Sequence, residues 1–307
     1  MEQKKKIILL AGPTASGKSK LAIKLARHFN GEIINADSMQ IYKEISILTS
    51  KPSIEDTKII KHHLYGFNSV KKKFSTGHWL QLAQEKIKEQ WKKNKIPIIV
   101  GGTGLYFKAL TDGLVKIPNI PSNLSIEIRK MHKKMGQEIF FQQLIKLDPL
   151  SKIFILPSDK QRSIRSYEVK KFTNKSLFEL IKETKPNFNG DIFCKLFINC
   201  PKELLHEKIK ERVKKMLQEG AVKEVEAFLK MKVYRELSSN KIIGIKEIKE
   251  HLKGNLTLIE TAELIEQKTR QYAKRQFTWA RGHMKSWETI YSPNINDLYK
   301  KAINKIS

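Results

Sequence analysis

Apolar runs alternate with amphipathic segments over the first 114 residues of this sequence. Helical spacing of apolar residues is found in residues 18–29 and again in residues 76–94. Buried strands are predicted where apolar residues follow one another closely, in the segments 6–11, 31–37, 63–67 and 96–104. Strands that alternate with helices predict a parallel sheet covered on both faces, in which ligands bind beyond the carboxyl ends of the strands.

The pattern changes after residue 114, where a proline-bearing segment precedes several charged helices in residues 124–184. A strand pattern returns at residues 194–201, and the remainder reads as helical to about residue 285. We therefore predict an α/β core made of residues 1–114 and 191–307, which includes C-terminal helices, and a helical insertion of residues 115–190.

Lysine and arginine total 59 against 31 acidic residues, which gives a formal net charge of +28. A charge of this size favours a polyanionic partner, and nucleic acid is the obvious one. The alternative is that much of the lysine only solvates the surface of a chain that is rich in Lys, Ile and Asn throughout.

The compartment is predicted to be reducing, because Cys194 and Cys200 are too few and too isolated for a disulfide framework or a zinc site. The basic and apolar amino-terminal run is short and continues into a glycine loop, so we interpret it as a strand and not as a signal peptide. The sequence contains no apolar stretch of about 18 residues, so we expect no membrane span. We expect a cytoplasmic protein.

The clearest motif is a glycine-rich loop between the first strand and the first helix. Gly12, Gly17, Lys18 and Ser19 stand at the spacing of a P-loop. Such a loop turns backbone N–H groups toward phosphate, the helix amino terminus adds its positive dipole end, Lys18 supplies a charge and Ser19 can bind Mg²⁺. The alternative, a chance glycine turn, does not require this strand and helix context.

The metal-binding acidic residue that often ends a later strand of hydrolysing P-loop enzymes is absent here, because that strand runs into the glycines of GGTG, residues 101–104. Asp37 instead follows the second strand, where its carboxylate would enter the same crevice. GGTG would let the backbone approach a ligand and would offer the Thr103 hydroxyl. The alternative is that Asp37 is a turn residue or a helix N-cap and that Thr103 is a helix N-cap, without a role in binding.

Two helical segments gather cations that could meet RNA. In the insertion, Gln161, Arg162 and Arg165 lie close together on one predicted helix. On the last long helix, one arc holds Arg270, Lys274 and Arg281, and another side holds Tyr272 and Trp279. The alternatives are a solvated helix face for the former and core packing for the aromatic side chains.

With these pieces in place the sequence resembles the tRNA dimethylallyltransferase family, also called tRNA isopentenyltransferases. The resemblance covers nearly the whole chain in eight segments that follow the family's order: GPTASGKS, NADSMQIY, HHLYGF, GGTGLYFKAL, DKQRSIRSYEV, MLQEGAVKEVEAFL, IIGIKEI and TRQYAKRQFTWAR. It implies a P-loop NTPase-like core and transfer of a dimethylallyl group from dimethylallyl diphosphate to the exocyclic amine of the adenosine 3′ to the anticodon. Diphosphate would be released, and Mg²⁺ would be the cofactor.

The resemblance also implies roles for residues of this chain. Asp37 is the expected base, and Thr14, Lys18 and Thr103 complete the expected catalytic set. The expected diphosphate or nucleotide loop comprises Gly12, Pro13, Thr14, Ala15, Ser16, Gly17, Lys18 and Ser19, of which Ser19 would bind Mg²⁺. The expected tRNA contacts are Asp37, Ser38, Met39, Gln40, Thr103, Gln161, Arg162, Ser163, Ile164, Arg165, Arg270, Lys274 and Arg281.

The expected partners are the tRNA anticodon stem-loop and dimethylallyl diphosphate, with no membrane, and we expect a monomer. A P-loop kinase for a small acceptor would use the loop and Asp37 equally well, but it would not account for the downstream arginine and aromatic segments. An RNA-binding protein with ATP or GTP as a switch is the second alternative. The sequence departs from the family pattern at ILTSKP, residues 47–52, and at RSYEV, residues 165–169, which bears on local packing and tRNA fit.

Overall fold

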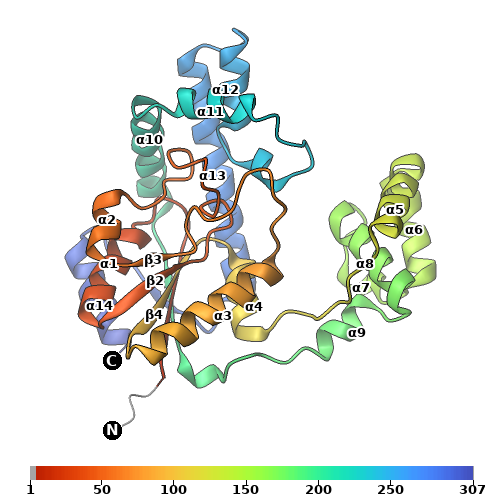
Figure 1. Ribbon diagram of the computed structural model, residues 1–307, viewed down its shortest axis with the longest axis horizontal. Helices are drawn as coiled ribbons and strands as arrows, with labels where there is room; N and C mark the ends of the chain where they lie inside the picture. The colour runs from red at the N-terminus through yellow and green to blue at the C-terminus, as the bar shows by residue number, and fades with distance from the viewer. Residues whose placement is uncertain (1–4, 307) are drawn as a thin grey trace. The chain divides into compact units, whose positions relative to one another are not determined.

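The computed structural model describes residues 5–306, so the predicted core ends at residues 1 and 307 lie outside the described residues. The chain forms two compact units (Figure 1). One unit contains the chain up to Thr111 and from Phe188 onward, and the other spans Asp112–Asn187. The second unit therefore begins three residues before the predicted start of the insertion, at residue 115, and ends three residues before its predicted end, at residue 190.

The first unit is built on a parallel sheet of six strands in the order β3-β2-β4-β1-β5-β6. The strands are β1 Ile7–Ala11, β2 Gly31–Asn35, β3 His62–His63, β4 Ile96–Gly101, β5 Phe193–Ile198 and β6 Glu288–Ile290. All five residues of β1 and of β2 are buried, and β1 is accordingly an unbroken apolar run, whereas β2 buries the polar Glu32 and Asn35 beside its isoleucines.

Helices cover both faces of this sheet, as Figure 1 shows with α1 and α14 on one side and α3 and α4 on the other. Their bounds are α1 Lys18–His28, α3 Thr76–Lys92, α4 Gly104–Asp112 and α14 Ile295–Ile306. Leu21 and Leu25 of α1 and Leu298 of α14 share one apolar cluster with Ile8 and Leu10 of β1. Because alternate residues of a strand face the same side, Ile8 and Leu10 both face the layer that α1 and α14 form.

A second apolar cluster joins the C-terminal helices of the first unit, including Ile209 and Val213 of α10, Val225 of α11, Ile248 of α12 and Ile265 of α13. The capping box of Thr257 and Glu260 begins the longest helix, α13. The remaining elements of this unit are α2 Ile54–Ile59, η1 Gly190–Ile192, α10 Lys202–Gln218, α11 Ala221–Lys230, η2 Ser238–Lys241, α12 Ile245–Leu252 and α13 Leu258–His283.

The second unit is helical, as its charged amphipathic pattern predicted. It has two small apolar clusters, one around Phe140 and one around Phe141 and Leu144. The buried Asp148 carboxylate accepts hydrogen bonds from the hydroxyls of Ser151 and Ser176, both at 2.9 Å. Its elements are α5 Ser122–Met135, α6 Gln137–Leu147, α7 Ser151–Phe154, α8 Lys160–Thr173 and α9 Leu177–Lys182.

The structure corrects several predicted elements. The second strand ends at Asn35 and not at residue 37, and the third is two residues long, at His62–His63 and not at 63–67. The strand β6 and the helix α14 were not predicted at all. Between residues 5 and 306, none of the helices is both long and apolar enough to cross a membrane.

Candidate active site

Three loops meet at one edge of the sheet because β1, β4 and β2 are neighbours and run in the same direction. The P-loop follows β1 after Ala11, GGTG continues from the end of β4, and Asp37 stands two residues after β2. The structure thus brings together the three segments that the strand-end rule placed in one crevice.

The P-loop has the backbone that an anion cradle needs. Ala15 and Gly17 both have positive φ, 61° and 91°, and α1 begins directly afterwards at Lys18. The buried Ser16 hydroxyl has no hydrogen-bond partner among residues 5–306 and lies in the loop that lines a cavity of about 630 Å³. Ser19 also lines this cavity and is exposed. The loop therefore surrounds a space with N–H and hydroxyl groups available to an oxyanion.

Lys18 is held inside this loop. Its ammonium group donates to the carbonyl oxygen of Pro13 at 2.5 Å. Burial lowers the pKa of Lys18 from its usual value to about 8, against the opposing attraction of Asp37, and the nearby Arg212 cation lowers it further. Lys18 and Arg212 therefore place two cations beside the loop, which favours a polyanionic ligand.

Asp37 is positioned by its neighbour Asn35, which is fully buried at the end of β2. The Asn35 side chain accepts the Asp37 backbone N–H at 2.8 Å and donates to the Asp37 carbonyl at 2.9 Å. One carboxylate oxygen of Asp37 accepts the Met39 N–H at 2.9 Å. Asp37 lines both the P-loop cavity and a second, smaller cavity.

Three tyrosines surround this carboxylate. Burial raises the pKa of Tyr65, Tyr106 and Tyr272 above the usual range, and the Asp37 charge raises each further. Tyr106 is stacked on Trp79 at 4.3 Å between ring centroids, and the Trp79 indole donates to the Asn35 carbonyl. The three tyrosines thus stay neutral. The stacked rings of Tyr106 and Trp79 support the turn of Asn35 and Asp37 through the bond to the Asn35 carbonyl.

Thr103 is joined to the Asp37 segment. Its hydroxyl oxygen accepts the Ser38 N–H at 2.9 Å, and the hydroxyl donates to the Ser38 side chain at 3.2 Å. The Gln40 amide is also engaged, since it donates to the carbonyls of Thr49 and Ser50. Among the predicted base-binding residues, Met39 lines a second cavity of about 260 Å³, and Gln40 lines the P-loop cavity.

The glycines of GGTG make close approaches within the chain, besides the approach to a ligand that we expected of them. A Cβ atom would lie 2.1 Å from the Ala36 carbonyl oxygen at Gly101, 2.0 Å from the Gln276 amide at Gly102 and 2.0 Å from the Trp279 indole at Gly104. The glycines are therefore required by the packing of α13 and of the β2 end against this loop.

Arg212 and Gln276 are site residues that sequence reasoning missed. The Arg212 guanidinium on α10 donates to the Thr14 hydroxyl at 2.7 Å. Gln276 on α13 accepts the Thr14 N–H at 2.9 Å. The helical stripe that contains Tyr272 and Trp279 was a usable signal for Gln276, but nothing in the local pattern marked Arg212.

The P-loop cavity and the second cavity share Thr14, Asp37, Thr49 and Arg212 on their walls. The P-loop cavity is rich in cations and hydroxyls, with Lys18 and Lys215 among its lining residues. The second cavity is more apolar, because its lining includes Met39, Leu48, Val213, Met216, Ile242, Ile243 and Ile265, together with the cations Lys241 and Arg275. The structure thus has a polar and an apolar compartment that meet at one carboxylate.

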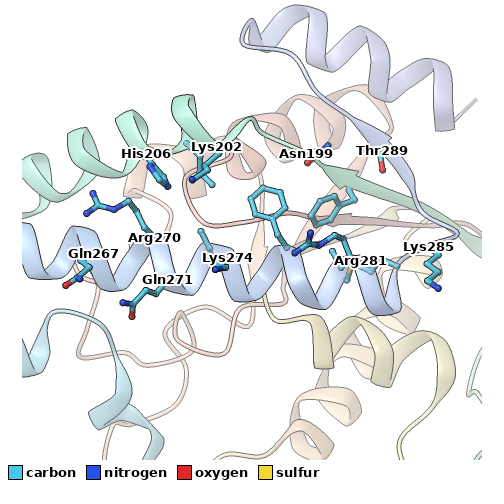
Figure 2. Close-up of a pocket in the computed structure, with 16 residues that line it drawn as sticks. Asn199, Lys202, His206, Gln267, Arg270, Gln271, Lys274, Arg281, Lys285 and Thr289 are labelled. Atoms are coloured by element: carbon cyan, nitrogen blue, oxygen red, sulfur yellow. The ribbon is translucent and has the colours of Figure 1, made fainter.

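A larger cavity, of about 770 Å³, lies beside α13 and contains the predicted basic arc. Figure 2 shows Arg270, Lys274 and Arg281 along one side of α13, with Lys202 across from them. Phe197 and Phe277 also line it. Arg270 is paired with Glu266 at 3.4 Å, and no ion pair is seen for Lys274 or Arg281 in the described part of the chain. Tyr272 and Trp279 belong to the other side of the helix, as the helical spacing predicted.

In the second unit, α8 presents Gln161, Arg162 and Arg165 on its exposed side. Ser163 and Ile164 are instead buried in the unit's interior, where the Ser163 hydroxyl donates to the Asp159 carbonyl and Ile164 joins the Phe140 cluster. The expectation that these two side chains contact tRNA is therefore corrected by their burial.

A metal ion at this site would need oxygen atoms of a bound phosphate ligand in addition to protein side chains. Within residues 5–306, no group of three or more His, Cys, Asp or Glu side chains could hold a metal ion. Mg²⁺ typically keeps several waters and takes one or two protein oxygens together with substrate phosphates. The Ser19 hydroxyl at the mouth of the phosphate cradle fits that mode of binding.

Comparison with known proteins gives concordant matches. The IPP transferase family model matches residues 40–283. A tRNA dimethylallyltransferase of Pelagibacter ubique is 52% identical over 307 residues, covering 100% of this chain and 98% of that protein. A protein of the same name from Rickettsia rickettsii is 43% identical and covers 98% of this chain and 84% of that protein.

Solved structures are similar over nearly the same length. A full-length tRNA isopentenylpyrophosphate transferase of Bacillus halodurans is 28% identical with a TM-score of 0.70, covering 99% of this chain and 97% of that one. A eukaryotic dimethylallyltransferase acting on tRNA is 30% identical with a TM-score of 0.79, covering 90% of this chain and 70% of that one. These neighbours have the P-loop NTPase-like fold that the sequence predicted.

Proposed function

This chain belongs to the IPP transferase family, and we propose that it transfers a dimethylallyl group from dimethylallyl diphosphate to the exocyclic amine of the tRNA adenosine 3′ to the anticodon. The dimethylallyl transfer to tRNA follows from the family. The observation that carries the finer proposal is the meeting of a cationic and an apolar cavity at Thr14, Asp37 and Arg212. An allyl diphosphate has these same two halves.

The diphosphate group would occupy the P-loop cavity. The bond that breaks joins the allylic carbon to a diphosphate oxygen, so negative charge grows on that oxygen as it leaves. N–H groups of the loop, the Lys18 ammonium and the Arg212 guanidinium line the space in which it grows. Preorganised donors of this kind stabilise a transition state more than a ground state whose charge is less developed.

Mg²⁺ would be held by the Ser19 hydroxyl and by oxygens of the diphosphate itself. When bound, it adds positive charge next to the leaving group. The proposed roles of the other residues do not require Mg²⁺. Lys18, Arg212 and the loop N–H groups bind and orient the diphosphate directly.

The adenine would enter from the apolar cavity, whose side chains suit both the five-carbon chain and the face of a base. Its exocyclic nitrogen is a poor nucleophile because its lone pair is delocalised into the ring. As that nitrogen forms its bond to the allylic carbon, the Asp37 carboxylate accepts the proton that the amine loses. Thr103 and Ser38 would hold the segment that carries Asp37, and Thr14 would sit at the junction of the two substrates.

The target base has to leave its stack, which costs a few kcal/mol and less in a loop than in a duplex. Two cationic surfaces are available to hold the rest of the anticodon stem-loop. These are the exposed side of α8, with Gln161, Arg162 and Arg165, and the cavity beside α13, with Lys274 and Arg281. Phosphate contacts from such residues give position and salt-dependent affinity.

We propose that the protein acts as a monomer. A tRNA substrate supports reaction in the cytoplasm. The kinase alternative would use the same P-loop and Asp37 with ATP as donor. It is less favoured because a nucleoside triphosphate does not need the apolar cavity on the other side of Asp37.

The test is to incubate the purified chain with Mg²⁺, unmodified tRNA and dimethylallyl diphosphate, and to analyse the nucleosides by mass spectrometry. We expect one adenosine per reactive tRNA to gain the mass of a dimethylallyl group. An unchanged adenosine, together with ATP turnover on a small acceptor, would favour the kinase.

A further inference from the structure

Gln276 joins two loops of the site although it comes from α13, far along the chain from both. Its Oε1 accepts the Thr14 N–H at 2.9 Å, and its Nε2 donates to the Gly102 carbonyl oxygen at 3.0 Å. Only 8% of the residue is exposed. One amide therefore satisfies a donor in the P-loop and an acceptor in GGTG at the same time.

The surroundings leave this side chain little freedom. A Cβ atom on Gly102 would lie 2.0 Å from the Gln276 amide nitrogen, so only glycine permits this contact. The cavity around Gln276 measures only about 10 Å³, room for about one water molecule, so the amide is closely enclosed.

The two loops hold opposite halves of the proposed reaction. Thr14 belongs to the loop that binds the diphosphate. Gly102 precedes Thr103, whose hydroxyl is bonded to Ser38 next to the base Asp37. The distance between the breaking bond and the proton acceptor thus depends on how these loops are held relative to each other.

The same helix also faces the cationic cavity on its opposite side. Lys274 and Arg281 line that cavity, whereas Thr269 and Tyr272, on the side of Gln276, line the apolar cavity. Lys274, two residues before Gln276, and Arg281, five residues after it, thus face a different cavity from the one on the side of Gln276. A rigid helix of 26 residues connects that surface to the amide between the two loops.

We infer that Gln276 is a positioning residue, which sets the P-loop and the GGTG loop at the separation that transfer requires. The inference rests on the proposed function and adds to it the residue that aligns the two substrates. Gln276 touches neither reacting atom. It acts through the Thr14 N–H and the Gly102 carbonyl, so its loss should reduce turnover rather than tRNA affinity.

Replacement by a carboxyl group tests this directly, because Gln276→Glu keeps the shape of the side chain. A protonated carboxyl can accept from Thr14 and donate to Gly102, as the amide does, whereas an ionised carboxylate cannot donate. The residues that line the small cavity carry no titratable group, so the introduced glutamate would be the titratable group there. The charged group that faces the cavity across Thr14 is the Arg212 guanidinium. Burial favours the neutral carboxyl.

The kcat of Gln276→Glu relative to the parent enzyme should fall at least ~10-fold at about pH 8.5 and recover as the pH is lowered, because misplacement of reacting groups by about 1 Å can cost ~100-fold. The Kd for tRNA should stay within about twofold. A ratio that is independent of pH and near unity would overturn the inference. Gln218→Glu, an exposed glutamine on α10 outside the site, is the matched control and should change neither quantity.

A measurement without catalysis separates this inference from the proposed function. Hydrogen exchange of the P-loop peptide that contains Thr14 should be faster in Gln276→Ala than in the parent chain or in Gln218→Ala, since the amide loses its acceptor. Unchanged exchange would overturn the inference even if activity fell. An inactive parent enzyme would contradict the proposed function, and the exchange comparison would still decide the role of Gln276.

Discussion

The Arg212 guanidinium donates a hydrogen bond of 2.7 Å to the Thr14 hydroxyl across 198 residues of sequence. Burial lowers the pKa of Arg212, and the attraction of Asp37 opposes that effect. The arginine therefore ties the middle of α10 to the first turn of the P-loop and carries its charge to the junction of the two cavities. This contact places a cation where the leaving diphosphate and the attacking amine would meet.

Loss of this cation should impair transfer. We expect Arg212→Ala to lower kcat/KM for dimethylallyl diphosphate by ~100-fold or more, because preorganised donors at a developing charge contribute this much in other enzymes. Arg212→Lys should recover only part of the loss, since an ammonium cannot reproduce the planar fork. Steady-state kinetics at saturating tRNA measure both.

The neighbouring Lys214, which is exposed on α10, supplies a control of equal charge. Lys214→Ala should leave kcat/KM for the diphosphate within about twofold. Equal losses in Arg212→Ala and Lys214→Ala would mean that overall charge, and not the Thr14 contact, is responsible.

Asp37 should matter for turnover and not for tRNA affinity. Asp37→Asn keeps an acceptor for the Met39 N–H but removes the proton acceptor, so kcat should fall by ~100-fold to ~10,000-fold. Asp37→Ala should lower turnover in the same way. Binding of labelled tRNA, measured in parallel, should change little, and a variant that keeps near-normal turnover would exclude Asp37 as the base.

The pKa of Lys18 predicts how diphosphate binding depends on pH. Because its pKa is lowered to about 8, the ammonium is charged below that pH and loses its charge above it. Affinity for dimethylallyl diphosphate should therefore decrease as the pH rises through about 8, by up to tenfold per pH unit for one linked proton. Equilibrium binding across this range gives the profile.

Lys18→Arg supplies the comparison, because an arginine remains charged throughout that range. Its affinity is expected to be weaker overall but independent of pH in this window. A parent profile as flat as that of Lys18→Arg would show that the Lys18 charge does not control binding.

The arginines on α8 should contribute salt-dependent tRNA affinity. Arg162 is exposed and pairs with Asp159 at 3.5 Å, and Arg165 pairs with the buried Glu168 at 3.3 Å. The double variant Arg162→Ala and Arg165→Ala should bind tRNA more weakly, and its affinity should vary less between ~50 and ~200 mM salt. Filter binding at several salt concentrations measures the slope.

Removal of two other cations from the same unit controls for general charge. Lys130 and Lys171 are exposed on α5 and α8. Their double alanine variant should lose less affinity than the arginine variant. An equal loss in both double variants would argue that the second unit attracts tRNA only through its net charge.

Local sequence patterns were sufficient for part of this site. The P-loop is contiguous, so Gly12 to Ser19 could be recognised from spacing alone, and the strand-end rule placed Asp37 beside it. The packing requirement on Gly102 and Gly104 could not be read from the sequence, because Gln276 and Trp279 impose it from α13. A glycine can be seen in a sequence, but the atom that requires it cannot.

Long-range contacts account for the other omissions. Arg212 stands in a lysine-rich helix, and only the packing of α10 distinguishes it from its neighbours. The helix α14 had a readable signal, because Leu298, Ala302 and Ile306 follow helical spacing and are buried against the sheet. The three residues of β6 were too few to give a pattern.

In the proposed reaction the P-loop holds a diphosphate that leaves, and not a nucleotide that donates phosphate. The most direct measurement counts diphosphate released and dimethylallyl-adenosine formed in one reaction that contains tRNA, Mg²⁺ and dimethylallyl diphosphate but no ATP. We predict one diphosphate per modified adenosine, with no requirement for ATP. Product formation that needs ATP, or modified adenosine without matching diphosphate, would contradict the account.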